Sequence, residues 1–584
     1  MKQPRQLGHF DNLVEMFLVR AAEKGDSPFL WAKRGGEWHS TSWAEARRQV
    51  IALAAGLKRL GLEPGDRVML VSENRPEWLI SDLAIMAAGC VTVPTYTTNT
   101  TRDHAHILGN SGARAVIVSS QKLAKTLIPA DLTSADCRHV LGMEEIRTGQ
   151  VPEWLNVHHW SKLADGKGDE KAVSALAKSA KREDLACIIY TSGTGGAPRG
   201  VMQHHGSLLH NIAGAADIIS TDFGWGDEVF LSFLPASHAL EHTGGQLFPI
   251  GLGAQIYYAE SLEKLASNIE ETRPTIMIVV PRLFEMLRAR ILKGLEGSGG
   301  ASRYLFRRAL GIGQQKYDGT LKPWDLPMDW LLERTLRKKL RAKVGGRVKA
   351  WVSGGAPLNP DVGIFFQSLG ITFLQGYGQT EAGPVISCNR PSVGIRLETV
   401  GVPVKDTEVK IAEDGEIMVR GELVMHGYWR NPEETKRVLS GDGWLATGDI
   451  GHFDDKGRIV ITDRKKDIIV NDKGDNIAPQ RIEGMLTLQS EIAQAMVYGD
   501  RKPHLVALLV PDPEIADTPD LQQRLSAAVD RVNSDVSIIE KVRRFIVADA
   551  PFTVENEQLT PSMKIRRHVI KDAYGNRLEA LYRR

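Results

Sequence analysis

The chain has 584 residues, and its 73 Lys and Arg nearly balance its 71 Asp and Glu, which leaves a formal net charge of +2. This balance gives no whole-molecule field that would attract nucleic acid, and a hydrophobic content of 42% excludes a mainly disordered chain. No apolar run is long enough to span a membrane, no secretory signal opens the chain, and the four cysteines lie far apart, so we expect a cytoplasmic protein.

The N-terminal part of the chain predicts strands that alternate with helices. A helix is expected to begin after Ser42, to continue with apolar residues at helical spacing, and to end at Gly61. Buried strands are expected at Arg67–Val71, Val91–Pro94 and Ala115–Ser119. This alternation favours a mostly parallel sheet with helices on both of its faces.

The same pattern continues through the middle of the chain and then changes. Further strands are expected at Leu185–Tyr190, Glu228–Leu234, Gln255–Tyr258, Ile276–Val280, Lys349–Ser353 and Ile371–Gln375. From about Val400, short alternating segments separated by turns indicate an antiparallel sheet. After Asp463, a charged stretch leads into a smaller α+β unit. The sequence therefore predicts an α/β fold with a large N-terminal part and a small C-terminal one.

One segment departs from the neutral average of the chain. From Ser302 to Ala350 there are 13 Lys and Arg against 4 Asp and Glu, with apolar residues such as Trp330, Leu331 and Leu336 interleaved. One interpretation is a basic amphipathic helix that contacts an anionic membrane surface. The other is a solvated helical face whose apolar side packs on its own domain.

The strongest local signal is a loop rich in glycine and hydroxyl groups, Tyr190–Val201, directly after a predicted strand. Glycines allow backbone N–H groups to converge on a phosphate, Ser and Thr hydroxyls add donors, and Arg199 adds a fixed positive charge. The Gly-Lys-Ser/Thr pattern of a Walker A loop is absent, which disfavours a P-loop NTPase. A flexible surface connection is the simpler alternative.

Four further segments carry residues suited to a nucleotide. Gln375–Ala382 brings together the aromatic ring of Tyr377, the hydroxyl of Thr380 and the carboxylate of Glu381, which suit purine stacking, a phosphate contact and Mg²⁺. Asp449 is suited to accept hydrogen bonds from ribose hydroxyls. Charged stretches follow at 463–467 and 559–567. Each segment taken singly is also compatible with a turn, a helix cap or a solvated charge run.

Together, these segments resemble in order and spacing the adenylate-forming superfamily of acyl-CoA synthetases, firefly luciferase and peptide-synthetase adenylation domains. The phosphate loop of that family reads Tyr-Thr-Ser-Gly-Thr-Thr-Gly-x-Pro-Lys-Gly-Val, and this chain departs from it at Gly195 and Arg199. Arginine keeps the charge with a different geometry, whereas Gly195 removes a hydroxyl. The other matches are Ser353–Leu358, Tyr377–Glu381, Asp449, Arg464 and Ser562–Ile565.

Finer features resemble the long-chain fatty acyl-CoA synthetases within this superfamily. Leu234–Glu241 is similar to their Leu-Pro-x-x-His-x-x-Glu segment, with His238 at the histidine position. The basic insertion before Ser353 and the Leu-Thr-Pro-Ser-Met-Lys segment ending at Lys564 are also similar to theirs.

The resemblance implies an enzyme that uses ATP, Mg²⁺ and CoA to convert a fatty acid into its CoA thioester through an acyl-adenylate. Phosphate-binding residues would be Thr191, Ser192, Gly193, Thr194, Gly196 and Arg199, together with Thr380. Residues for adenosine would be Gly355, Ala356, Tyr377, Gly378, Asp449 and Arg464. The metal would be held by Glu381 and Thr194. Catalytic roles would fall to Lys564, Thr380, Glu381, His238 at the acyl carboxylate, and Lys466 at a hinge.

It also implies an organisation into an N-terminal domain of parallel-rich sheets at 1–463, a distorted β-barrel subdomain at about 390–463, a hinge at 464–467 and a small mobile α+β domain at 468–584. Three alternatives remain open. The enzyme could load a carrier protein instead of CoA, or act on shorter or aromatic acids. The chain could also be a membrane-surface scaffold with a degenerate nucleotide site. We expect no nucleic acid partner, and a dimer is compatible with the sequence.

Overall fold

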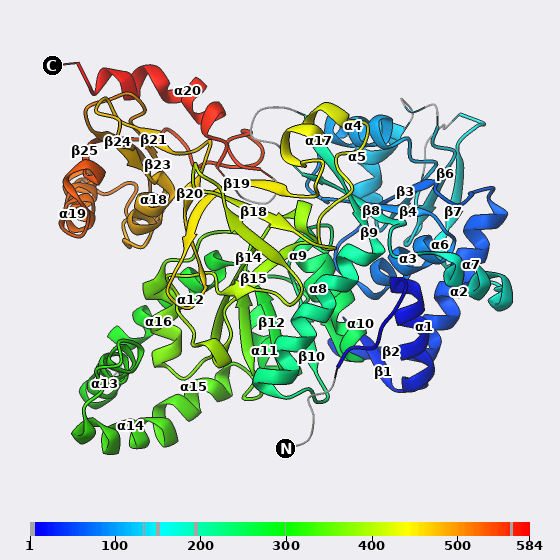
Figure 1. Cartoon of the computed structure of the whole chain (residues 1–584), viewed down its shortest axis with the longest axis horizontal. Helices are drawn as coiled ribbons and strands as arrows, with labels where there is room; N and C mark the ends of the chain where they lie inside the picture. The colour runs from blue at the N-terminus through cyan, green and yellow to red at the C-terminus, as the bar shows by residue number, and fades with distance from the viewer. Residues whose placement is uncertain are drawn as a thin grey trace.

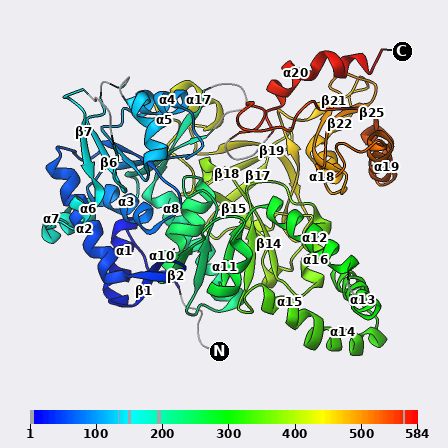
Figure 2. The same ribbon diagram turned by 180° about the vertical axis from the view of Figure 1, so that it is seen from behind.

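The computed structural model describes residues 6–131, 134, 136–147, 152–191, 197–297, 299–560 and 565–583. Two large sheets with their helices form most of the molecule, and a four-stranded sheet joins them to a small C-terminal unit (Figure 1). The view from behind shows the same order of parts, with the C-terminal unit above the second large sheet (Figure 2).

The first large sheet has seven strands in the order β7-β6-β5-β3-β4-β8-β9. Their bounds are β3 Arg67–Val71, β4 Val91–Thr95, β5 Ala115–Val118, β6 His139–Gly142, β7 Asn156–His159, β8 Leu185–Thr191 and β9 Arg199–His204. All neighbours are parallel except β9, which turns back antiparallel on β8. The predicted strands of this region are therefore confirmed, and their continuous apolar character reflects burial on both faces.

The second large sheet has nine strands in the order β16-β15-β14-β13-β12-β10-β11-β1-β2. Their bounds are β1 Pro28–Arg34, β2 Glu37–Ser42, β10 Val229–Ser232, β11 Gln255–Tyr258, β12 Ile276–Val279, β13 Ala350–Ser353, β14 Phe373–Gly378, β15 Val385–Cys388 and β16 Val402–Pro403. Its central strands are parallel, whereas the edges at β2, β15 and β16 are antiparallel. β14 extends through Gly376-Tyr377-Gly378, where the sequence predicted that the strand had already ended.

Helices pack on both large sheets, and some of them contribute to one core that the two sheets share. They are α1 Leu13–Lys24, α2 Trp43–Arg59, α3 Pro76–Ala87, α4 Thr101–Ser111, α5 Gln121–Asp131, α6 Trp160–Ala164, α7 Glu170–Ser179, α8 His205–Ile218, α9 Ala239–Glu241, α10 Phe248–Leu252, α11 Leu265–Thr272, α12 Pro281–Glu296 and α16 Pro360–Ser368. α2 begins as predicted, because the Ser42 hydroxyl accepts the Glu45 amide. Apolar residues of both sheets, such as Ile117 and Phe230, meet Trp43 and Trp78 in this core.

The basic segment forms a helical projection at the lower left of Figure 1. It consists of α13 Gly300–Tyr317, α14 Leu326–Leu332, one wider π-type turn at Glu333–Arg337 and α15 Lys338–Lys343. α13 packs against α16 and buries Phe306, Ala309 and Ile312.

A four-stranded antiparallel sheet confirms the prediction of antiparallel strands after about Val400. Its strands are β17 Glu408–Ile411, β18 Glu416–Arg420, β19 Leu445–Phe453 and β20 Ile459–Arg464, and the helix α17 Pro432–Val438 lies beside it. Its apolar face packs on Val201 of β9 and Ile386 of β15, so this sheet is fixed to both large sheets. β20 extends to Arg464, which is therefore paired within the sheet.

The C-terminal unit has its own core on both sides of a small sheet. It contains β21 Ile469–Val470, β22 Asn476–Ile477, β23 Ile492–Tyr498, β24 Leu505–Pro511, β25 Val542–Val547, α18 Pro479–Thr487, α19 Leu521–Ser534 and α20 Arg567–Ala580. α18 and α19 cover one face, and α20 covers the other. Across the described part of the chain, no helix combines the length and apolar character that crossing a membrane requires.

Candidate active site

The predicted phosphate loop connects β8 to β9. Thr191 ends β8, Arg199 begins β9, and the two residues are partners in the antiparallel ladder. The loop between them therefore leaves and re-enters the sheet at one point, at the end of a buried strand. Ser192, Gly193, Thr194 and Gly196 lie outside the described residues, as does Lys564.

Arg199 is linked to Glu381 through a tyrosine that the sequence analysis did not single out. The Arg199 guanidinium pairs with Glu434 at 2.7 Å and lies 4.7 Å from the ring centre of Tyr428. The Tyr428 hydroxyl donates to Glu381 Oε1 at 2.9 Å. Burial and the neighbouring Glu381 carboxylate raise the pKa of Tyr428 far above its usual value, so the phenol stays protonated as a donor.

The turn after β14 presents Thr380 and Glu381. A single 3₁₀ turn, Thr380–Ala382, follows the strand, and Gly378 is required because a Cβ there would lie 1.8 Å from the Pro384 carbonyl oxygen. The Gln203 side-chain amide donates to the Thr380 carbonyl at 2.7 Å. Strand β9 therefore fixes the backbone that carries these two candidate residues.

Behind this turn lies a buried chain of polar side chains that sequence reasoning missed. Gln203 Oε1 accepts from the Cys187 thiol at 3.4 Å, and the thiol lies 3.9 Å from Nδ1 of His242. His242 Nε2 in turn contacts Asp82 Oδ2 at 2.8 Å, and both of these side chains are fully buried. These residues come from four separate segments, so no spacing in the sequence indicates their contact.

Tyr377, Asp449 and Arg464 form a second connected group. The Tyr377 hydroxyl donates to Asp449 Oδ2 at 2.6 Å, and Arg464 Nε lies 3.6 Å from Asp449 Oδ1. Asp449 and Arg464 are cross-strand partners on β19 and β20. Burial and Asp449 raise the pKa of Tyr377 well above its ordinary value. Three residues that the sequence singled out separately therefore meet at one place.

The turn after β13 lies beside the turn that carries His238. Gly355 has a φ of +81°, a backbone conformation that favours glycine. A Cβ at this position would lie 3.9 Å from the side chain of Leu240. Gly355 and Ala356 are both exposed. His238 caps the short helix α9, and its Nδ1 accepts the Leu240 amide at 3.2 Å. Leu240 therefore bridges the two turns.

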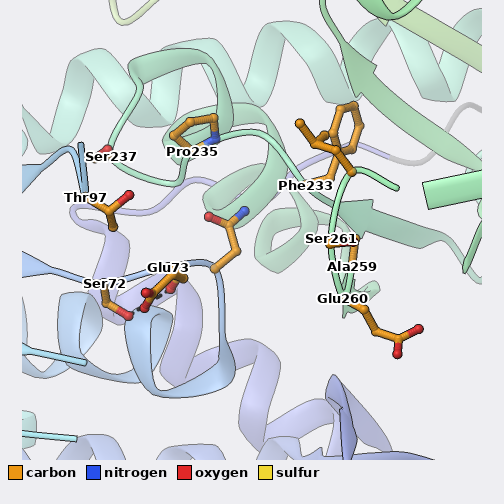
Figure 3. Close-up of a pocket in the computed structure, with 11 residues that line it drawn as sticks. Ser72, Glu73, Thr97, Phe233, Pro235, Ser237, Ala259, Glu260 and Ser261 are labelled. Carbon is orange, nitrogen blue, oxygen red and sulfur yellow. Dashed lines mark hydrogen bonds between the residues drawn. The ribbon is translucent and has the colours of Figure 1, made fainter. Parts of the chain in front are cut away.

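A pocket of about 270 Å³ opens where strands of the two large sheets end (Figure 3). Figure 3 shows Ser72, Glu73 and Thr97, which follow strands of the first sheet. They face Phe233, Pro235, Ser237, Ala259, Glu260 and Ser261, which follow strands of the second. Asn74 ties the two sheets together, because its amide nitrogen donates to the Ser232 hydroxyl at 2.8 Å and the Leu234 carbonyl at 2.6 Å. The pocket thus borders the segment that leads to His238.

The charged stretch after β20 is held by ion pairs. Lys465 pairs with Asp414 at 2.6 Å and with Glu416 at 2.9 Å, so the adjoining Lys466 follows an anchored residue. The surrounding protein and the Arg464 charge lower the pKa of Lys466 from its ordinary value, and the Arg199 charge contributes in the same direction. Burial raises the pKa of Asp463 to about 6.

A divalent metal bound here would depend on few protein ligands. Among the described residues, no three His, Cys, Asp or Glu side chains come together as a metal cage. Glu381 supplies a hard carboxylate oxygen at the end of β14, and Mg²⁺ is commonly bound by one or two carboxylates together with substrate phosphates. The residues present therefore fit a metal that arrives with a nucleotide.

Comparison with known proteins places this geometry in a family. The model of the AMP-binding enzyme family matches residues 17–429, and that of the AMP-binding enzyme C-terminal domain matches residues 466–584. The chain is 33% identical to the long-chain-fatty-acid–CoA ligase FadD15 of Mycobacterium tuberculosis, over 99% of this chain and 98% of the relative. It is 28% identical to the chloroplastic long-chain-fatty-acid–[acyl-carrier-protein] ligase AEE15 of Arabidopsis thaliana, over 93% of this chain and 82% of the relative.

The solved structures agree on the fold. The A domain of a carboxylic acid reductase from Segniliparus rugosus, in complex with AMP and a co-purified carboxylic acid, gives a TM-score of 0.74 at 22% identity, over 98% of this chain and 94% of that one. The predicted α/β fold, with a large N-terminal part and a small α+β C-terminal part, is thus confirmed. Because the family match covers most of the chain and relatives align along all of it, this protein belongs to the family of AMP-binding enzymes.

Proposed function

We propose that this AMP-binding enzyme is a long-chain fatty acid–CoA ligase. In the first step, a carboxylate oxygen of the fatty acid attacks the α-phosphorus of ATP, and the bond to pyrophosphate breaks. In the second step, the CoA thiol loses its proton and attacks the acyl carbon, and AMP leaves. The observation that carries this proposal is the meeting of Tyr377, Asp449 and Arg464 beside the Thr380–Glu381 turn and Arg199.

The phosphates would be bound at the β8–β9 loop and the turn after β14. Thr191, Arg199 and the intervening hydroxyls of Ser192 and Thr194 would hold the β- and γ-phosphates, with Gly193 and Gly196 giving backbone access. Thr380 would contact the α-phosphate. Magnesium, bound by Glu381 with Thr194, would neutralise charge on the phosphate oxygens. The Arg199–Glu434 ion pair supports this role, because it holds the guanidinium beside the ring of Tyr428, whose hydroxyl donates to Glu381.

Adenosine would occupy the space between the β13 and β14 turns. Tyr377 and Gly378 would line one side of the base, and the exposed backbone of Gly355 and Ala356 would line the other. The Asp449 carboxylate would accept from the ribose hydroxyls. Its contacts with Tyr377 and with the cross-strand Arg464 support this role, because they hold the carboxylate in a fixed position.

The C-terminal unit would take a different orientation in each of the two steps. We assign residues 1–463 to the adenylation domain, 464–467 to the hinge and 468–584 to the mobile domain. Lys564 would bridge the carboxylate and the α-phosphate in the first step, where its positive charge stabilises the developing negative charge. Rotation at Lys466 would withdraw Lys564 and open the path for CoA. His238 would lie near the acyl carboxylate and close the fatty acid site.

The test is a panel of carboxylic acids of graded length, scored by CoA-dependent release of AMP. We expect long-chain acids to give the highest kcat/KM, and we expect AMP to be released only when CoA is present. Release that requires a phosphopantetheine carrier protein instead would favour the carrier-loading alternative, which the name of the AEE15 relative keeps open. A preference for short or aromatic acids would overturn the chain-length assignment. If no acid led to release of pyrophosphate, the result would favour the alternative of a membrane-surface scaffold with a degenerate nucleotide site.

A further inference from the structure

The helical projection of α13–α15 exposes large apolar side chains to solvent. The exposed fractions are 72% for Trp324, 54% for Leu326, 56% for Trp330 and 42% for Leu331. They fall within eight consecutive residues of a part of the molecule that extends away from both large sheets (Figures 1 and 2). A cluster of this kind on a surface marks an interaction site more often than chance exposure.

The folded core does not use these side chains. Leu332 and Leu336 face inward, where they pack with Ala309 and Ile312 of α13, and Leu340 packs on the core of the second sheet. These three residues recur every four positions and form the buried stripe of the helix. Trp330 and Leu331 lie on the opposite stripe. The buried stripe packs within the protein, as one of the two interpretations predicts, and the other stripe faces solvent.

The charge around the exposed stripe is positive after all internal pairing. Asp325 pairs with Arg308 at 2.7 Å, and Asp329 pairs with Lys316 and Arg337, each at 2.6 Å. Glu333 pairs with Arg341 at 2.5 Å. Three of the four acidic residues of the segment are thus neutralised within it.

Basic side chains remain on the same projection. Arg334, Lys338, Lys339 and Lys343 are exposed, and none of them pairs with an acidic side chain that the structure describes. Arg334 lies 4.3 Å from the ring centre of Trp330, and Lys322 lies 5.4 Å from that of Trp324. Each indole therefore sits beside a cation. Tryptophan is enriched at the interface between lipid headgroups and acyl chains, where its ring is half apolar and half polar.

We propose that this projection is a docking surface for an anionic lipid bilayer. Trp324, Leu326, Trp330 and Leu331 would enter the headgroup region, while Arg334 and the three lysines contact lipid phosphates. The mixture of exposed tryptophan with unpaired cations matches such a surface in both polarity and charge. This proposal goes beyond the ligase reaction and does not depend on it.

The test is co-sedimentation of the full-length protein with vesicles of phosphatidylcholine alone and of phosphatidylcholine mixed with phosphatidylglycerol. We expect binding only to the mixed vesicles, and weaker binding as salt is raised. The triple variant Arg334→Ser/Lys338→Ser/Lys339→Ser should bind roughly a hundredfold more weakly, since each basic residue near such a surface contributes about fivefold. Trp330→Ser/Leu331→Ser should lose about tenfold or more.

The matched control removes three charges at the other end of the molecule, through Lys167→Ser/Lys171→Ser/Lys178→Ser in and beside α7. This variant should bind mixed vesicles as the wild type does, and all variants should keep the wild-type thermal midpoint. If the control variant lost as much vesicle binding as the triple variant, net charge alone would explain the binding, and the proposal would be overturned. The proposal would also be overturned if Trp330→Ser/Leu331→Ser bound vesicles as the wild type does. Absence of vesicle binding, with a dimer that the same variants dissociate, would assign this face to a second copy instead.

Discussion

The protonation state of the buried Glu241 carboxyl, three residues beyond His238, can be tested through the pH dependence of stability. Its side chain is 1% exposed, and its Oε1 accepts from the Ser232 hydroxyl at 2.6 Å and from the Gln246 amide at 3.3 Å. Gln246 in turn accepts from the Tyr258 hydroxyl at 3.0 Å. Burial raises the pKa of Glu241 from 4.5 to about 8, so the carboxyl is mostly protonated at neutral pH.

This raised pKa makes the free energy of unfolding fall as pH rises. Below pH 4.5 both the folded and unfolded states hold the proton, so Glu241 gives no pH dependence there. Between pH 4.5 and about 8 the unfolded chain has released the proton while the folded protein still holds it. The slope is about −1.4 kcal/mol per pH unit, and the full window therefore costs about 5 kcal/mol.

The variant Glu241→Gln should remove this slope, because a neutral amide of the same shape can still accept from Ser232. We expect the free energy of unfolding of the variant, relative to the wild type, to rise by about 2.7 kcal/mol between pH 5.5 and pH 7.5. Urea unfolding followed by tryptophan fluorescence measures it, with Glu37→Gln on the exposed β2 as the control. Parallel pH profiles for wild type and Glu241→Gln would refute the reasoning, since they would mean that Glu241 ionises alike in both states.

Three further predictions concern the reaction. Lys564→Ala should abolish formation of the acyl-adenylate yet spare thioester formation from supplied acyl-adenylate, measured as two half-reactions; loss of both with the fold intact contradicts the role. Glu381→Ala should need at least tenfold more Mg²⁺ for pyrophosphate release, and a wild-type Mg²⁺ titration would remove the metal assignment. Gln203→Leu leaves the Thr380 carbonyl without its donor and should slow adenylation about tenfold, since such a bond contributes about 1–2 kcal/mol. Its control, Cys187→Ala, disturbs the same buried chain without touching Thr380; equal slowing by that variant would show that the effect is only structural.

Local patterns were enough to predict the fold elements that carry the candidate site. Arg67–Val71 was recognisable as a strand because a strand buried on both faces is a continuous apolar run. Ser42 and Gly61 marked the ends of a helix because capping depends on nearby residues alone. Tyr377, Thr380, Glu381, Asp449 and Arg464 stood out for the same reason, since each belongs to a short motif whose residues are neighbours in the sequence.

Contacts between distant segments could not be predicted in this way. Tyr428 connects Arg199 to Glu381, and Gln203 holds Thr380, but no fixed spacing relates these residues along the chain. Only the antiparallel return of β9 on β8 and the docking of the four-stranded sheet bring them together. Packing of this kind depends on which surfaces remain apolar after each element has formed, and many segments of one sequence compete for it.

The basic segment at 302–350 illustrates which properties follow from the sequence and which follow from the tertiary structure. The sequence by itself determined its excess of positive charge and the helical spacing of its apolar residues, because both are properties of neighbouring positions. The tertiary structure alone decided that Leu332 and Leu336 face α13 while Trp330 and Leu331 face solvent. A helix with apolar residues on two sides can bury either one, and the position of α13 against α16 selects which side remains exposed.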